Sequence, residues 1–236
     1  MAFQNSLLYR AVRRRGCLVL KCLLVLTIVA YVGLSCLDYA LYAGNKPGAA
    51  PPPCSETDEY RAILMDLAYK THLILDNLGV EHWLMYGSLW GPLRGIHEPL
   101  PWDFDVDYGI NGSSGIFQKM TWEEFKAKLS EAGVRVFDKL KSTGSLTLRP
   151  KSSGANVDIY LYYDRGGYMM RSGYEPWLLC IHYLLYHRFP SRLVQKPLPK
   201  VKFGHFNVSV PREGIEIMKY LYRFNWWKVV KPVGCE

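Results

Sequence analysis

Acidic residues are missing from the first 21 positions of the chain, although this stretch holds five basic ones: Arg10, Arg13, Arg14, Arg15 and Lys21. The formal net charge of the 236 residues is +8, so five of these charges lie in the leader and three remain for everything else. Proteins that bind nucleic acid concentrate lysine and arginine on the folded domain. We therefore expect no nucleic-acid partner.

Charge is also missing between Cys22 and Leu37, and Cys17–Leu20 extends this apolar run beyond Lys21. About 20 apolar residues cross a bilayer, and a lysine near one end can reach the interface. The run predicts a transmembrane signal-anchor over 17–37. The arginines before it and the first acid after it, Asp38, predict a cytosolic tail at 1–16 and a lumenal C-terminal part. A cleaved signal peptide is the alternative, which the length of the run and the poor cleavage site disfavour.

Core-forming residues are scarce from 38 to 55, where Gly44, Pro47, Gly48 and three consecutive prolines, 51–53, predict an extended stem. An anchor, a stem and a domain over 56–236 form the layout of transferases of the Golgi and endoplasmic reticulum. By this analogy we expect a single-pass type II protein of the Golgi or endoplasmic-reticulum membrane with a lumenal domain. Two sequons, at Asn111 and Asn207, fit that location.

Cysteines with the close spacing of a structural zinc site are absent. Cys54, Cys180 and Cys235 would face an oxidising lumen. One pair with one leftover thiol is possible, as is an intermolecular bridge through Cys54.

Lysine and arginine are missing around Asp103, Asp105 and Asp107, which alternate with Phe104 and Val106. If this segment is a strand, all three carboxylates lie on one face. Carboxylates this close repel one another unless a cation lies between them, so the pattern predicts a divalent-metal site. The alternative is the solvated face of an edge strand.

Gly87-Ser88 follows an expected short strand, His82–Tyr86, and precedes an expected helix, Leu89–Ile96. A glycine lets the backbone approach an oxygen-rich group, and N–H groups at a helix start bind phosphate. Ser88 adds a hydroxyl donor. Arg94 could reach the same phosphates, although a surface role fits it almost as well.

The rest of the domain reads as mixed helices and strands. We expect helices over Glu56–Leu78, Thr121–Gly133 and Glu213–Phe224, and strands over Val134–Leu140, Ser145–Leu148 and Asn156–Tyr163; Pro176–Tyr186 stays undecided. Thr121 and Glu124 form a capping box. His72 is expected to be a surface or capping residue rather than a ligand. Asp158, in the last strand, needs either a basic partner such as Arg149 or the cations held by Asp105 and Asp107.

These residues resemble the signature of the LicD and fukutin-related family. The resemblance rests on Tyr86–Leu89, Gly91, Arg94, Pro101–Asp103, Asp105–Asp107 and Val157–Ile159, and more loosely on Phe189-Pro190, Val201–Phe203 and Val210-Pro211. It covers roughly Asp58 to Trp227. It implies an α+β fold, a nucleotidyltransferase-like mixed sheet flanked by helices, here preceded by the transmembrane helix and the proline-rich stem.

The resemblance also implies a phosphotransferase. Such an enzyme moves phosphocholine or a polyol phosphate, such as ribitol phosphate, from a CDP-alcohol donor to a hydroxyl of a glycan or glycoprotein. Asp105, Asp107 and Asp158 would be catalytic and would hold Mg²⁺ or Mn²⁺, and Asp158 would help to deprotonate the acceptor. Gly87, Ser88, Arg94 and Asp103 would bind the substrate.

Two other functions remain open on the sequence. Asp105-Val106-Asp107 also fits the metal motif of a Golgi glycosyltransferase that uses a nucleotide sugar. A non-catalytic member of the same fold is the other alternative. The oligomeric state stays unknown.

Overall fold

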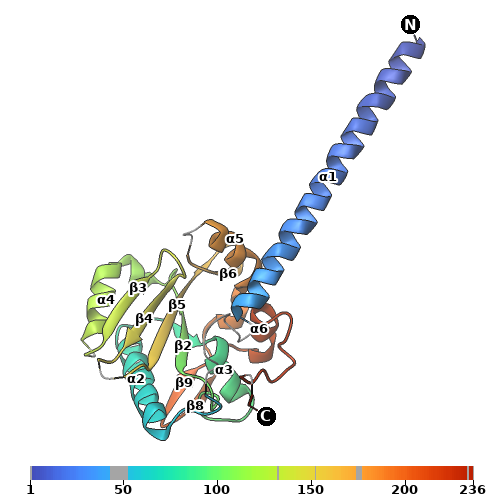
Figure 1. Ribbon diagram of the computed structural model, residues 1–236. Coiled ribbons are helices and arrows are strands. Elements are labelled where there is room, and N and C mark those ends of the chain that lie inside the picture. The colour runs from blue at the N-terminus through green and yellow to red at the C-terminus, as the bar shows by residue number, and fades with distance from the viewer. Residues whose placement is uncertain are drawn as a thin grey trace. The chain divides into compact units, whose positions relative to one another are not determined.

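The computed structural model describes residues 2–42, 53–131, 133–151, 153–173, 177–232 and 234–235, without the side chains of 2–15, 37–42 and 177–180. The chain divides into two compact units, 1–48 and 49–236 (Figure 1). Most of the predicted stem and the side chain of Cys180 lie outside the described residues.

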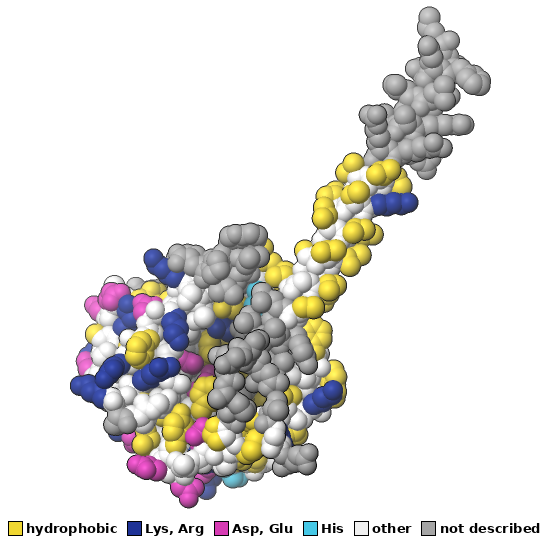
Figure 2. All heavy atoms as spheres, in the orientation of Figure 1, with side chains coloured by type: hydrophobic (Ala, Val, Ile, Leu, Met, Phe, Trp, Pro, Cys, Tyr) yellow, Lys and Arg dark blue, Asp and Glu magenta, His cyan; other side chains and the backbone are white. Residues whose placement is uncertain are grey.

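The described residues of the first unit form one helix, α1 (Ala2–Tyr42). Its stretch Gly16–Cys36 is long and apolar enough to cross a membrane. Figure 2 shows apolar side chains covering this part of the helix, where Leu18 is 65% and Val29 is 63% exposed. A helix with apolar side chains on all sides fits a membrane anchor, and an N-terminal signal sequence has the same properties.

The second unit is built on a seven-stranded mixed sheet. Five strands follow the order β1-β2-β5-β4-β3, while β6 pairs with β5 and β7 with β6. Their bounds are β1 His82–Leu84, β2 Asp105–Asn111, β3 Arg135–Lys139, β4 Ser145–Arg149, β5 Asn156–Asp164, β6 Tyr168–Arg171 and β7 Arg188–Pro190. A separate hairpin joins β8 (Lys200–Phe203) to β9 (Phe206–Ser209). The α+β class is thereby confirmed.

Helices flank this sheet (Figure 1). They are α2 (Asp58–Asn77), α3 (Tyr86–Leu93), α4 (Trp122–Ser130), α5 (Trp177–Tyr186) and α6 (Gly214–Leu221), with 3₁₀ turns at Gly115–Gln118 and Ser191–Val194. The capping box of α4 is confirmed, since Thr121 and Glu124 bond reciprocally. The undecided segment before Tyr186 is helical.

The two faces of β2 have opposite character. Val106, Tyr108 and Ile110 are buried, and the Tyr108 hydroxyl donates to the Ala68 carbonyl of α2. Because side chains alternate along a strand, Asp105 and Asp107 lie on the face opposite α2. The helix α3 packs against β2.

Two local expectations were wrong. We expected Asp103 on the acidic strand, but β2 begins at Asp105. The strand before Gly87 ends at Leu84, and the helix begins at Tyr86, so the Gly87-Ser88 turn is the first turn of α3 itself.

His72 is not a surface residue. It is 6% exposed, and its Nδ1 lies 2.7 Å from Nε2 of the equally buried His82. Burial lowers the pKa of both rings, that of His82 to about 4. Both rings are therefore neutral at pH 7.

A disulfide joins Cys54 to Cys235 across 181 positions of sequence. This bond is one of the pairings that the sequence left open for Cys54, Cys180 and Cys235. The bond ties the residues just before α2 to those after α6.

Replacing Gly91 by alanine tests the packing of α3. An added Cβ would overlap the Glu98 carbonyl oxygen, which belongs to backbone and cannot rotate away. We expect Gly91→Ala to destabilise the domain by about 2 kcal/mol or more in urea unfolding, despite the higher helix propensity of alanine. Gly154→Ala is the control, because its Cβ would meet nothing within 4 Å. Equal stability of the two variants would contradict this packing.

Candidate active site

Three aspartates converge on the sheet face opposite α2. The strands β2 and β5 run parallel, with Asp107 directly opposite Asp158. Paired residues on neighbouring strands point to the same side, and Asp105 lies two positions before Asp107 on that side. One carboxylate oxygen from each lies within 4.8 Å of the other two. The structure thus brings together the residues that the sequence predicts as metal ligands.

Asp107 is the most buried of the three. It is 6% exposed, and its Oδ1 has no hydrogen-bond partner among the described residues. Burial, then the neighbouring Asp105 and Asp158, raise the pKa of Asp107 well above its usual range. A buried oxygen that lacks a donor, surrounded by like charges, matches what a hard divalent cation binds. The donor set therefore fits Mg²⁺ or Mn²⁺.

Asp158 has a partner other than the predicted arginine. The Thr147 hydroxyl, on the adjacent strand β4, donates to Asp158 Oδ1. Arg149 Nε instead donates to Asn156 Oδ1 at 2.5 Å. The orientation of Asp158 is fixed by a neutral donor, so its charge is left for a cation.

The start of α3 is bonded to the acidic strand. The Asp107 N–H donates to Ser88 Oγ at 2.8 Å, and the Met85 N–H donates to the Asp107 carbonyl at 2.9 Å. A Cβ on Gly87 would lie 3.5 Å from both oxygens of Asp103. Gly87 and Ser88 therefore lie beside the carboxylates, as the sequence predicts.

Asp103 and Arg94 lie at the margin of this group. Burial raises the pKa of Asp103 to about 6, opposed by the Leu100 N–H and by the charges of Arg94 and Arg61. The Arg94 guanidinium lies 4.5 Å from the Trp90 ring centroid and donates to the Lys228 carbonyl at 3.3 Å. Arg94 is thus held on the surface of α3, near Asp103.

Arg171 is a site residue that our sequence analysis missed. It is 7% exposed, and its charge lowers the pKa of Asp107. The guanidinium lies 4.3 Å from the Tyr160 ring centroid and 4.6 Å from that of Tyr183, and donates to the Tyr86 hydroxyl at 3.0 Å. Two tyrosine faces and a buried acid make this arginine a fixed positive charge beside the carboxylates.

Tyr86 belongs to the family signature in the sequence, but its structural role in the site was not predicted. It has a φ of 45°, which is rare for a residue other than glycine. Its hydroxyl lies 2.7 Å from the Tyr162 hydroxyl and 3.0 Å from His187 Nδ1. These buried bonds hold the strained turn that starts α3. The sequence feature that could have indicated this role is the position of Tyr86 directly before Gly87.

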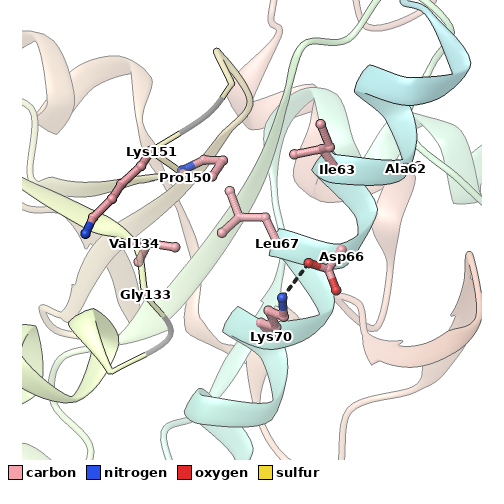
Figure 3. Close-up of a pocket in the computed structure, with 9 residues that line it drawn as sticks. All are labelled: Ala62, Ile63, Asp66, Leu67, Lys70, Gly133, Val134, Pro150 and Lys151. Atoms are coloured by element: carbon pink, nitrogen blue, oxygen red, sulfur yellow. Dashed lines mark hydrogen bonds and ion pairs between the residues drawn. The ribbon is translucent and has the colours of Figure 1, made fainter.

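A pocket elsewhere in the domain is unrelated to these acids. It measures about 550 Å³ and lies between α2 and residues beside β3 and β4 (Figure 3). Its walls are apolar at Ile63, Leu67, Val134 and Pro150, and Asp66 pairs with Lys70 at its edge. It includes none of the residues predicted for the site.

Removing the Ser88 hydroxyl should loosen the acidic strand. Ser88 is 1% exposed, so Ser88→Ala leaves the Asp107 N–H buried without its acceptor. We expect a loss of about 1–3 kcal/mol in unfolding free energy. Ser130→Ala, which removes an exposed hydroxyl bonded to Lys126, should change it by less than about 0.5 kcal/mol. A Ser88→Ala protein as stable as that control would show that the bond contributes nothing.

The ionisation of Asp103 should lower stability as the pH rises. Its pKa in the fold, about 6, is above the value near 3.9 of an exposed aspartate, so the folded state binds more protons between these values. Asp103→Asn removes this penalty. In EDTA, we expect its stability relative to wild type to increase from pH 4 to pH 7 by on the order of 2–3 kcal/mol. A difference that stays constant over this range would show that Asp103 ionises normally.

Comparison with known proteins identifies the family. The family model described as the LicD/FKTN/FKRP nucleotidyltransferase domain matches residues 79–213. The mouse protein named ribitol 5-phosphate transferase FKRP is 28% identical over 184 residues, 73% of this chain and 34% of that protein. Its human counterpart is 30% identical over 166 residues, 68% of this chain and 30% of that protein. This chain therefore spans about a third of the length of either relative.

A solved structure, an antigenic nucleotidyltransferase-like protein from Paracoccidioides brasiliensis, is 17% identical, with a TM-score of 0.37 over 72% of this chain and 66% of that one. The family model covers more than half of the chain and includes Gly87, Ser88, Asp103, Asp105, Asp107 and Asp158. The chain belongs to the LicD/FKTN/FKRP nucleotidyltransferase-domain family.

Proposed function

We propose that this protein is a metal-dependent phosphotransferase. It moves a polyol phosphate or another phospho-alcohol, with ribitol phosphate as the first candidate, from a CDP-activated donor to a glycan hydroxyl. Family membership and the activity given in the names of the two relatives support this class of reaction. The apolar N-terminal helix supports a site on the lumenal side of a Golgi or endoplasmic-reticulum membrane.

The main support for the proposal is that the carboxylates of Asp105, Asp107 and Asp158 lie close together on one sheet face. Asp158 comes from a strand about fifty positions after the other two, so its position beside them follows from the fold rather than from local sequence. Burial and the charges of Asp105 and Asp158 raise the pKa of Asp107, whose Oδ1 has no hydrogen-bond partner among the described residues. A purely structural role does not account for them.

In the proposed mechanism these three aspartates hold Mg²⁺ or Mn²⁺. The bound cation supplies Lewis-acid stabilisation of charge on the phosphoryl oxygens. Asp158, already oriented by Thr147, accepts the proton of the attacking glycan hydroxyl, whose oxygen bonds to the phosphorus of the phospho-alcohol as the diphosphate bond breaks and CMP leaves. Arg171 offsets part of the negative charge of the aspartates and positions Tyr86.

The start of α3 binds the donor phosphates in this proposal. Gly87 presents backbone beside Asp103 without a side chain in the way. The Ser88 hydroxyl accepts from the Asp107 N–H, which leaves its proton for a phosphate oxygen. Asp103 and Arg94, linked electrostatically, line the margin of this phosphate site.

Asparagine substitutions at the three aspartates test the proposal. Asp105→Asn, Asp107→Asn and Asp158→Asn should each lower Mn²⁺-dependent transfer from CDP-ribitol by about 100-fold or more, because each removes a charged oxygen ligand. Without metal these variants should melt at or above the wild-type temperature, since each relieves repulsion. Asp164→Asn, at the exposed end of β5, is the matched control.

A panel of donors separates the proposal from its competitors. Stabilisation against heat by CDP-alcohols with Mn²⁺ supports a phosphotransferase. Protection by UDP or GDP sugars instead would indicate a glycosyltransferase that uses Asp105 and Asp107. Full activity in the Asp158→Asn protein would remove that residue from the mechanism, and failure to bind any divalent metal would indicate a non-catalytic member of the family.

A further inference from the structure

A second group of potential metal ligands lies at the junction of α2 and β1. His72 and Asp76 are one helical turn apart at the end of α2, and His82 opens β1. One ligand atom from each of the three lies within 4.8 Å of the others. None of these residues belongs to the acidic site, and our sequence analysis did not expect His72 to be a ligand.

The distances among these atoms are close to those of a three-ligand metal site. His72 Nδ1 and His82 Nε2 are 2.7 Å apart, and Asp76 Oδ1 lies 3.9 Å from His82 Nε2. In a tetrahedral zinc site with Zn–N bonds of about 2.0–2.1 Å, two ligand nitrogens are about 3.3 Å apart. A shift of roughly half an ångström between the rings therefore makes room for the ion.

The surroundings orient His82 as metal-binding histidines are oriented elsewhere, and they pack His72 against an aromatic ring. His82 Nδ1 lies 2.8 Å from the Val80 carbonyl, an acceptor that places the proton on Nδ1 and leaves the Nε2 lone pair free to bind. His72 stacks on Phe206 with ring centroids 5.2 Å apart, and its Nε2 lies 3.5 Å from Asp76 Oδ2. Because His82 Nε2 carries a lone pair, the His72 Nδ1–H donates to it in the metal-free site, and a metal ion between the two nitrogens would take the place of that proton.

We propose that His72, Asp76 and His82 form a zinc site, with His72 Nδ1, His82 Nε2 and Asp76 Oδ1 as ligands. Two imidazoles and one carboxylate favour Zn²⁺ over Mg²⁺, which prefers oxygen ligands. Both rings are buried, whereas the Asp76 side chain is 49% exposed, so the ion enters and takes its fourth, water ligand from that side.

Charge around the group is balanced rather than strongly negative. The negative charge of the group comes from Asp76, and Lys200, at the start of β8, is a nearby positive charge. Zinc binding moves the His72 proton from Nδ1 to Nε2, so both imidazoles stay neutral and no proton is released.

We expect the site to be structural, because it would clamp the end of α2 to the strand that leads into α3.

Cobalt substitution tests this site without any enzymatic assay. The full chain, in detergent and stripped with EDTA, is titrated with Co²⁺ in excess Mg²⁺, which occupies the oxygen-rich acidic site. We expect one equivalent of Co²⁺ to give the strong visible absorption of four-coordinate cobalt, and Zn²⁺ to displace it and raise the melting temperature. His205→Gln, at an exposed histidine near Phe206 but outside the group, is the matched control and should bind Co²⁺ normally.

Asp76→Asn keeps the proposal testable if histidine variants do not fold. Its side chain is half exposed, so the fold should tolerate it, and Zn²⁺ affinity should fall by at least about 10-fold. His72→Gln and His82→Gln should abolish the cobalt spectrum. If wild type gives no such spectrum, or if Asp76→Asn and His72→Gln bind Zn²⁺ as wild type does, then the two rings form a hydrogen-bonded pair only and the proposal is wrong.

Discussion

Repulsion among Asp105, Asp107 and Asp158 is the constraint on which the domain's chemistry depends. The parallel pairing of β2 with β5 fixes Asp107 opposite Asp158, and alternation adds Asp105 on the same face. Hydrophobic burial on the opposite face, through Val106 and Val157, holds this arrangement against the electrostatic cost. A sheet that buries its apolar face against α2 thus forces the carboxylates together, and a bound cation would remove the electrostatic cost of this arrangement.

The elements around the acids reduce that cost only in part. Arg171 supplies one positive charge, fixed between Tyr160 and Tyr183. It also bonds to Tyr86, whose left-handed backbone starts α3, so the same arginine influences both the acids and the helix that approaches them. Charge compensation and the placement of the turn proposed to bind phosphate are therefore coupled through one buried side chain.

Much of this arrangement was accessible from the sequence, for identifiable reasons. Capping and periodicity are local, so the limits of α2 and the capping box at Thr121 could be predicted. The acids of β2 are visible as an alternating run. The convergence of Asp158 was expected because a carboxylate in an apolar strand needs a partner, and the resemblance to the family pointed to the same residue.

What the sequence did not reveal depends on long-range contacts. The sequence around Arg171 indicates only the end of a short strand. The pairing of β6 with β5 is what brings the arginine near Asp107. His72 has helical spacing and a polar side chain, which suggested a surface position. It is buried because the β8–β9 hairpin places Phe206 against it, 134 positions later. No local pattern carries that information.

The β1–β2 pair separates the two groups of proposed metal ligands. His82 lies edge-on to Tyr108, with ring centroids 5.7 Å apart, and Tyr108 contacts α2, so the histidines belong to the α2 side. The aspartates lie on the other side and offer oxygen alone. Nitrogen ligands select zinc, and a crowded oxygen cluster selects Mg²⁺ or Mn²⁺. Two ions of different chemistry would then bind on opposite sides of one ribbon without competing, the zinc fixing the strand that delivers α3 to the other.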